Sequence, residues 1–165
     1  LQSDMFISCG QLVSNQFITL GQDIASEIGS RIPLIYTSTR FNELGYIWKV
    51  ILNETAKIPA FHNRLPEADH NEIAGFNDNS ASLFQGIFLL DKFNQHLNQH
   101  IDLYIKLLKT HNIPVSEITL EGSSLGEQIV SSMILAHWIA LDLATSNNVD
   151  PIANSEIENF KKQLT

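Results

Sequence analysis

The chain has 165 residues, a length typical of a single domain with a sizeable core. Hydrophobic residues make up 44% of it and charged residues 17%, a composition that excludes an intrinsically disordered chain. Its 10 Lys and Arg residues against 18 Asp and Glu residues give a formal net charge of −8, and without a basic cluster we expect no nucleic-acid partner.

The sequence carries no pattern typical of membrane insertion or export. No apolar run reaches the roughly 18 residues that a membrane span needs, and no basic segment with a cleavage site opens the chain. We therefore expect a cytoplasmic protein that does not bind membranes. The single cysteine, Cys9, excludes an internal disulfide and a multi-thiolate metal site, in agreement with a reducing compartment.

Short apolar runs alternate with longer periodic ones along the chain, the pattern of a parallel sheet covered by crossover helices. In chain order they predict a helix over 10–28, a strand over 32–36, a helix over 41–57, strands over 58–61 and 83–90, a helix over 93–111, a strand over 115–120, and helices over 124–147 and 155–164. We therefore predict a fold of the α/β class, a three-layer α/β/α sandwich with a mostly parallel, doubly wound sheet. It is formed by one domain over residues 1–165.

The predicted helix over 124–147 differs from the others in its pattern. Ser124 and Glu127 have the spacing of a capping box at its start. The helix is then apolar on nearly all sides, through residues such as Met133, Trp138 and Leu143. A helix of this kind is buried, here between the sheet and another layer or a partner subunit.

The densest polar stretch runs over residues 53–76 and surrounds the second predicted strand. Glu54 falls at the edge of the apolar stripe of the helix before it, where partial desolvation would raise the pKa of a carboxyl group toward the range of a general base. Glu54 and Lys57 are also spaced as an ordinary surface pair on a helix. Periodicity alone favours the surface pair.

Histidines and a serine-rich turn offer further candidates. His70 could move protons at neutral pH, with Asp69 and Glu72 orienting its ring, although a histidine in a polar turn is more often simply solvated. His96 and His100 have the i, i+4 spacing of two metal ligands on a helix, but no third ligand is indicated, so we expect no metal. The turn over 122–124 could hold an anion, but Ser124 acting as a plain helix cap explains the same residues.

Three segments together resemble one enzyme family. Residues 51–61, ILNETAKIPAF, and residues 65–76, LPEADHNEIAGF, resemble two motifs of the bifunctional phosphoglucose/phosphomannose isomerases, with Phe76 where tryptophan is usual. Near the end, NVDP at 148–151, followed by the helix that carries Lys161, resembles a third, with Asn148 in place of glycine. In this order the motifs cover residues 24–164 and resemble the carboxy-terminal of the family's two sugar isomerase (SIS) domains.

The resemblance implies an SIS-type fold and the aldose–ketose isomerisation of hexose 6-phosphates through an enediol, without metal or organic cofactor. The substrates would be glucose 6-phosphate and mannose 6-phosphate, with fructose 6-phosphate as the product. By matched position it implies Glu54 as the proton-transferring carboxylate, with His70 and Lys161 as the ring-opening pair. Asn154 stands where relatives place a Thr or Gln that positions the sugar. The resemblance also implies a homodimer in which His70 reaches the neighbouring subunit's site.

The chain departs from the family in its first residues. Residues 1–20 match no family motif, the Ser/Thr-rich phosphate loops are absent, and neither Arg31 nor Arg40 matches the family's arginine. With Leu1 in place of Met at the start, this leads us to expect the carboxy-terminal half of a longer two-domain isomerase that is nearly inactive alone. The alternatives are a non-catalytic phosphosugar-binding module and an oligomerisation domain built on the apolar helix around 133–143.

Overall fold

The computed structural model describes residues 15–91 and 95–164 of the chain. Its longer elements follow one another as α2 (Asn15–Ile28), β1 (Ile32–Ser38), α3 (Asn42–Glu54), β2 (Phe61–Leu65), β3 (Phe84–Leu90), α4 (Gln95–Thr110), β4 (Val115–Thr119), α5 (Leu125–Ser146) and α6 (Ser155–Lys162). Short 3₁₀ helices connect β1 to α3 and β2 to β3. Cys9 and the first residues of the helix predicted over 10–28 lie outside the described residues, as do residues 93 and 94 of the one predicted over 93–111.

The four strands form one parallel sheet in the order β2-β1-β3-β4. Leu34 in β1 lies opposite Phe61 of β2 and Gly86 of β3, so β1 and β3 occupy its centre. All four strands therefore run in the same direction, with their first residues along one side of the sheet and their last residues along the opposite side. Helices α3 and α4 return the chain between parallel strands, as crossover helices must.

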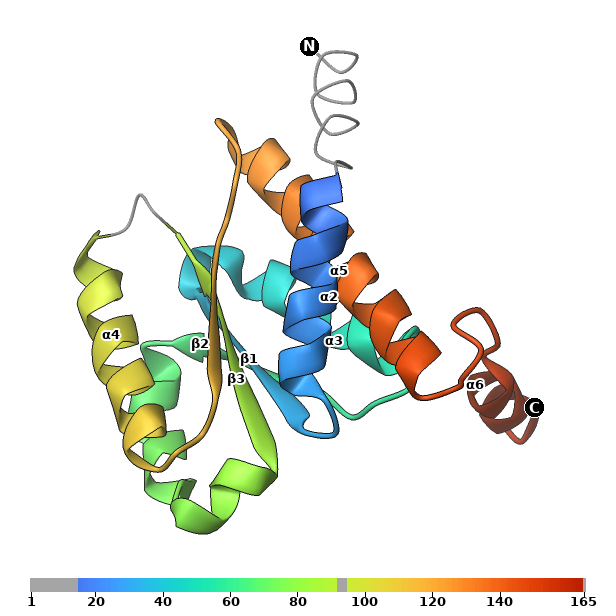
Figure 1. Ribbon diagram of the computed structural model, residues 1–165, viewed down its shortest axis with the longest axis horizontal. Coiled ribbons are helices and arrows are strands. Elements are labelled where there is room, and N and C mark those ends of the chain that lie inside the picture. Colours follow the sequence, from blue (N-terminus) through green and yellow to red (C-terminus); the bar gives the residue numbers. More distant parts are fainter. Residues whose placement is uncertain (1–14, 92–94, 165) are drawn as a thin grey trace.

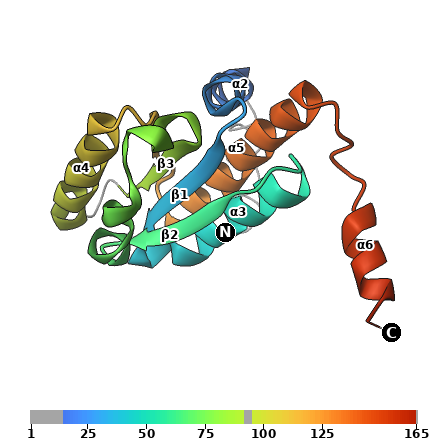
Figure 2. The same ribbon diagram turned by 90° about the horizontal axis from the view of Figure 1, so that it is seen from below.

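Helices cover both faces of the sheet. Figures 1 and 2 show α2, α3 and α5 on one side of the strands and α4 on the other. One buried cluster joins α2, α3 and α5 to the sheet and includes Ile35, Trp48 and Ile139. A second joins α4 to the opposite face and includes Phe88 and Leu108. The predicted three-layer α/β/α architecture with a parallel sheet is confirmed.

Helix α5 is the apolar helix predicted to be buried. Its buried residues Leu135, Ile139 and Leu143 belong to the cluster on the α2 and α3 side of the sheet. The indole Nε1 of Trp48 in α3 donates a 2.9 Å hydrogen bond to Ser132 Oγ in α5. Among the described residues it is also the one helix that is long and apolar enough to cross a membrane, with a mean hydropathy of 1.4. Packing against α2 and α3 gives it the surroundings of a core helix.

The second strand lies later in the chain than predicted. We expected it over 58–61, whereas β2 spans Phe61–Leu65 and the residues before it form an extended connection. The strand is at the edge of the sheet, and only Leu65 of its five residues is buried. An edge strand with so little buried surface has no apolar run to mark it.

Helix α6 stands apart from the layers. Figure 2 shows it at the end of an extended connection that leaves α5, and every residue of α6 is exposed. Its apolar side chains are solvent-facing as well, with Phe160 64% exposed. The contacts that place α6 therefore lie near its beginning, at the pocket described below.

Candidate active site

The end of α3 and the beginning of α6 enclose a pocket of about 530 Å³. Helix α3 ends at Glu54, after which the chain turns through Lys57 with a φ of 57°. Asn53 holds this turn, because its side-chain Nδ2 donates a 2.8 Å hydrogen bond to the carbonyl oxygen of Ile58. The pocket is lined by Asn53, Glu54, Lys57, Ile58, Pro59, Val149, Asp150, Ala153, Asn154, Ser155, Glu156 and Ile157.

The pocket brings together two of the four residues that the resemblance assigned to the site, Glu54 and Asn154. Lys57 connects their two segments. Its ammonium group donates to the backbone carbonyl oxygen of Glu54 and, over 3.0 Å, to Oδ1 of Asn154. The surface pair expected between Glu54 and Lys57 therefore has a different form, because the ammonium group contacts the backbone oxygen of Glu54.

Glu54 is exposed in this chain, so the expected partial desolvation of its carboxyl group is wrong. The reason is its place at the last residue of α3. The apolar stripe of that helix packs on the sheet, but at Glu54 the chain leaves the core and the side chain stands at the pocket. The group is accessible to a small polar ligand.

Lys161 lies on α6, whose first residues line the pocket, but does not line the pocket itself. It is about 9 Å along the helix axis from Ser155, at 1.5 Å per residue. Its exposed ammonium group forms a 3.0 Å ion pair with Glu158 on the same helix. Lys161 therefore lies near the pocket, and the position of α6 decides whether its ammonium group can reach a ligand bound there.

His70 and Glu54 lie at opposite ends of the strands: Glu54 is near the ends where the strands begin, and His70 is near the ends where they finish. Helix α3 runs back to the edge where the strands begin, and Glu54 is its last residue. His70 ends the 3₁₀ helix η2 (Glu67–His70) directly after β2, at the edge where the strands end, and is exposed. A single copy of the chain therefore does not bring these two side chains together.

The carboxylates beside His70 do not orient its ring. Asp69 Oδ2 lies 2.8 Å from Nδ1 of His100 in α4. Glu72 accepts hydrogen bonds from Tyr36, Tyr104 and Asn63. Sequence reasoning placed both acids at His70 because they are its neighbours in the chain, whereas the fold supplies each with partners from distant elements.

The remaining candidates have structural partners. The carboxylate of Glu127 accepts hydrogen bonds from the backbone N–H and the hydroxyl of Ser123, which lowers the pKa of Glu127 and occupies the place an anion would take. Ser124 caps α5 by accepting from the N–H of Glu127, as predicted. No group of three or more His, Cys, Asp and Glu residues in the described part of the chain could hold a metal. The side chain of His96 lies outside that part.

Residues 18–164 match the sequence model of the family described as bacterial phospho-glucose isomerase C-terminal SIS domain. The chain belongs to this family. The chain is also similar to a bifunctional phosphoglucose/phosphomannose isomerase of Thermoplasma acidophilum, to which it is 32% identical over 149 residues, 89% of this chain and 47% of the relative. Another, from Aquifex aeolicus, is 29% identical over 87% of this chain and 46% of the relative.

The chain therefore spans about half the length of the curated relatives it matches. Solved structures show the same fold. A glucose-6-phosphate isomerase like protein from Thermus thermophilus superposes with a TM-score of 0.68 at 17% identity, over 86% of this chain and 46% of that one. The expected resemblance and the SIS-type fold are thus both confirmed for this member of the C-terminal SIS domain family.

Proposed function

We propose that this chain is the carboxy-terminal SIS domain of a two-domain aldose–ketose isomerase. The reaction interconverts glucose 6-phosphate or mannose 6-phosphate with fructose 6-phosphate, in the cytoplasm and as part of glycolysis and gluconeogenesis. The observation that carries the proposal is the pocket of about 530 Å³ that holds Glu54 and Asn154 together, beside the helix of Lys161. The names and similarity of the curated relatives support the substrate class.

The chemistry of Glu54 follows from its position. Its carboxylate takes the proton from C2 of the open-chain aldose and gives an enediol, then returns a proton to C1 to give the ketose. A second proton moves between the two sugar oxygens, from the C2 hydroxyl to the former carbonyl oxygen on C1. Because Glu54 is exposed at the pocket, a bound sugar carbon can come within reach of its carboxylate oxygens.

Ring opening needs an acid and a base near the ring oxygen and the anomeric hydroxyl. In the proposal Lys161 and His70 have these roles, and Asn154 hydrogen bonds to the sugar. The opposite placement of His70 and Glu54 in one copy supports an active homodimer, in which the His70 of each subunit serves the pocket of the other. The isolated domain would turn over slowly, because the phosphate is anchored by the other domain.

The test uses the protein encoded by the complete gene. Formation of fructose 6-phosphate is measured from glucose 6-phosphate and from mannose 6-phosphate, in the wild type and in Glu54→Gln. We expect turnover that falls by about 10²–10⁴-fold in the variant, the usual effect of removing a general base. Glu43→Gln removes a carboxylate at the other end of the same helix and is expected to keep full activity.

Unchanged turnover in Glu54→Gln would overturn the role of Glu54. A folded wild-type protein without turnover that binds either sugar phosphate would favour the non-catalytic binding module instead. Binding of neither sugar by a folded oligomer would favour the oligomerisation domain.

A further inference from the structure

The turn that carries His70 is fixed to the domain by a half-buried carboxylate two residues further along, that of Glu72. Its Oε2 accepts a 2.8 Å hydrogen bond from the hydroxyl of Tyr36 and a 3.3 Å hydrogen bond from that of Tyr104. Its Oε1 accepts a 2.6 Å hydrogen bond from Nδ2 of Asn63. The three donors come from β1, α4 and β2, so one side chain joins the turn to two strands and a helix.

Two of the three donors to Glu72 are buried tyrosines. Tyr36 and Tyr104 are 1% and 3% exposed, and their rings pack on each other with centroids 5.0 Å apart. Burial raises the pKa of both phenols, with the charge of Glu72 acting in the same direction. Both hydroxyls therefore stay protonated and remain donors at physiological pH. Hydrogen bonds to an ionised acceptor, between fixed partners, are stronger than those between neutral groups.

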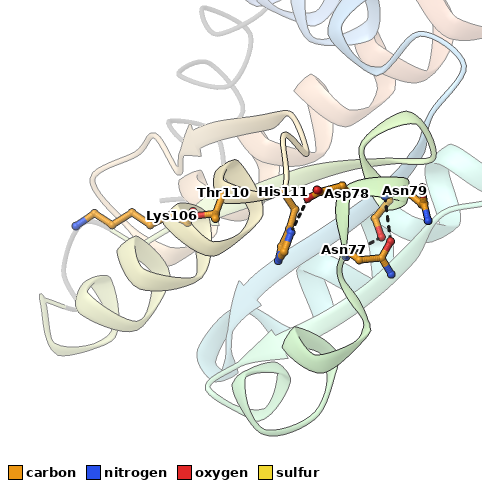
Figure 3. A network of polar contacts seen from close by, with 7 residues as sticks. Asn77, Asp78, Asn79, Lys106, Thr110 and His111 are labelled. Carbon is orange, nitrogen blue, oxygen red and sulfur yellow. Dashed lines mark hydrogen bonds and ion pairs between the residues drawn. The ribbon is translucent and has the colours of Figure 1, made fainter.

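Two other carboxylates pair with histidines nearer the surface, Asp69 in the same turn and Asp78 at the start of the next 3₁₀ helix, η4 (Asp78–Ser82). Asp69 pairs with His100 at 2.8 Å, and Asp78 pairs with His111 at 3.0 Å. Figure 3 shows the ring of His111, the residue after α4, directed toward Asp78. With His100 47% exposed and Asp78 84% exposed, solvent and salt weaken both pairs. Of these three carboxylates, Glu72 is the one whose donors include two buried side chains, those of Tyr36 and Tyr104.

We infer that Glu72 is the residue that positions His70. The carboxylate holds the turn over 67–75 against β1, β2 and α4, so that the exposed imidazole of His70 projects from the domain in one fixed place. This role rests on the proposed function, in which His70 acts at the pocket of a second subunit. An imidazole that must reach across a subunit boundary depends on the rigidity of its own turn, because small displacements of a catalytic group reduce the rate strongly.

The kinetic test uses the protein from the complete gene and the variants Glu72→Gln, His70→Asn and their combination. We expect Glu72→Gln to lower kcat by about tenfold or more with little change in KM, because the sugar contacts at Glu54 and Asn154 are untouched. In the His70→Asn background the same change is expected to have almost no further effect, because two residues that act as a unit are not additive. Asp78→Asn is the matched control and is expected to keep the wild-type kcat.

Losses that multiply in the double variant would overturn the inference, since they would show that Glu72 acts independently of His70. Equal losses in Glu72→Gln and Asp78→Asn would also overturn it. A wild-type protein without isomerase activity would remove the catalytic role of His70 and hence this role of Glu72.

A second measurement, hydrogen exchange, does not depend on turnover. In the same protein, Glu72→Gln is expected to speed amide exchange over residues 67–75 at least tenfold, while residues 44–52 of α3 keep their wild-type rates. Unchanged exchange over 67–75 would show that the carboxylate does not hold the turn and would overturn the inference even in an active isomerase. Faster exchange without activity would locate the failure in the proposed function instead.

Discussion

Nζ of Lys57 lies 3.0 Å from Oδ1 of Asn154, and this hydrogen bond joins residues 97 positions apart in the sequence. It connects the end of α3 to the start of α6, whose own residues are all exposed. The position of α6 relative to the pocket therefore depends on a contact made by Asn154, the residue directly before the helix.

The first prediction concerns Lys57→Met, which keeps the length of the side chain and removes the ammonium group. Without its hydrogen bond to Asn154, α6 is less restrained, and Lys161 is less often in place. We expect kcat/KM for the hexose phosphates to fall about tenfold in the protein from the complete gene, with faster amide exchange over 155–162. Lys106→Met, on the exposed side of α4, is the control and should change neither quantity. Wild-type exchange in Lys57→Met would contradict the prediction.

The layered fold could be predicted from the sequence because each buried element repeats its apolar residues at the period of a helix or a strand. Strands β1, β3 and β4 were expected within two residues of their observed bounds. The bounds of strand β2 were predicted too early in the chain, because β2 is defined by its hydrogen bonds to β1 and not by buried apolar side chains. The register places polar Asn63 opposite Tyr36, and no run of apolar residues marks that pairing.

The site could be predicted only in part, for a related reason. Motif resemblance brought out Glu54 and Asn154, which the structure places in one pocket. It could not show that Glu72 holds the His70 turn, because Tyr36 and Tyr104 are 36 and 32 residues away from Glu72 in the sequence. The one available signal was the position of Glu72 within the dense polar stretch over 53–76. Such a stretch does not show which acid accepts hydrogen bonds from buried side chains.

The second prediction concerns Gly45, a buried residue of α3 that lies over β1 and β2. A Cβ atom at this position would collide with the ring of His62 and lie 2.8 Å from Thr37 Cγ2. We expect Gly45→Ala to lower the free energy of unfolding by about 1–3 kcal/mol, as overpacking of a core does. Gly75→Ala is the control, because no heavy atom lies within 4 Å of its added Cβ. Urea unfolding measures both, and equal stability of the two variants would contradict the prediction.

The third prediction concerns the pH dependence that His62 gives to stability. Burial lowers the pKa of His62 below its ordinary value near 6.5, an effect that Glu43 and Glu72 oppose only in part. Between the two pKa values the unfolded chain binds the proton and the folded chain does not, so folding is destabilised as the pH falls below about 6.5. The neutral ring is also the form that can accept the 3.0 Å hydrogen bond from the Thr37 hydroxyl.

Thermal unfolding between pH 7.5 and pH 5 tests this. We expect the melting temperature of the wild type to fall over that range by more than that of His62→Gln. The exposed His137 provides a matched control, and His137→Gln should follow the wild-type curve. A curve for His62→Gln parallel to that of the wild type would show that His62 contributes no pH dependence.

The last prediction concerns the buried hydrogen bond between Trp48 in α3 and Ser132 in α5, whose atoms lie 2.9 Å apart. Trp48 is fully buried, so in Ser132→Ala its indole N–H loses its partner in a place that water does not reach. We expect the free energy of unfolding to fall by about 1–3 kcal/mol, the cost of an unpaired buried donor. Thr145→Ala removes a hydroxyl from the exposed side of the same helix and should cost less than about 0.5 kcal/mol. In a Trp48→Phe background no donor remains, so Ser132→Ala should lower the free energy of unfolding by less than it does in the wild type. An equal loss in both backgrounds would show that the hydrogen bond does not stabilise the contact between the two helices.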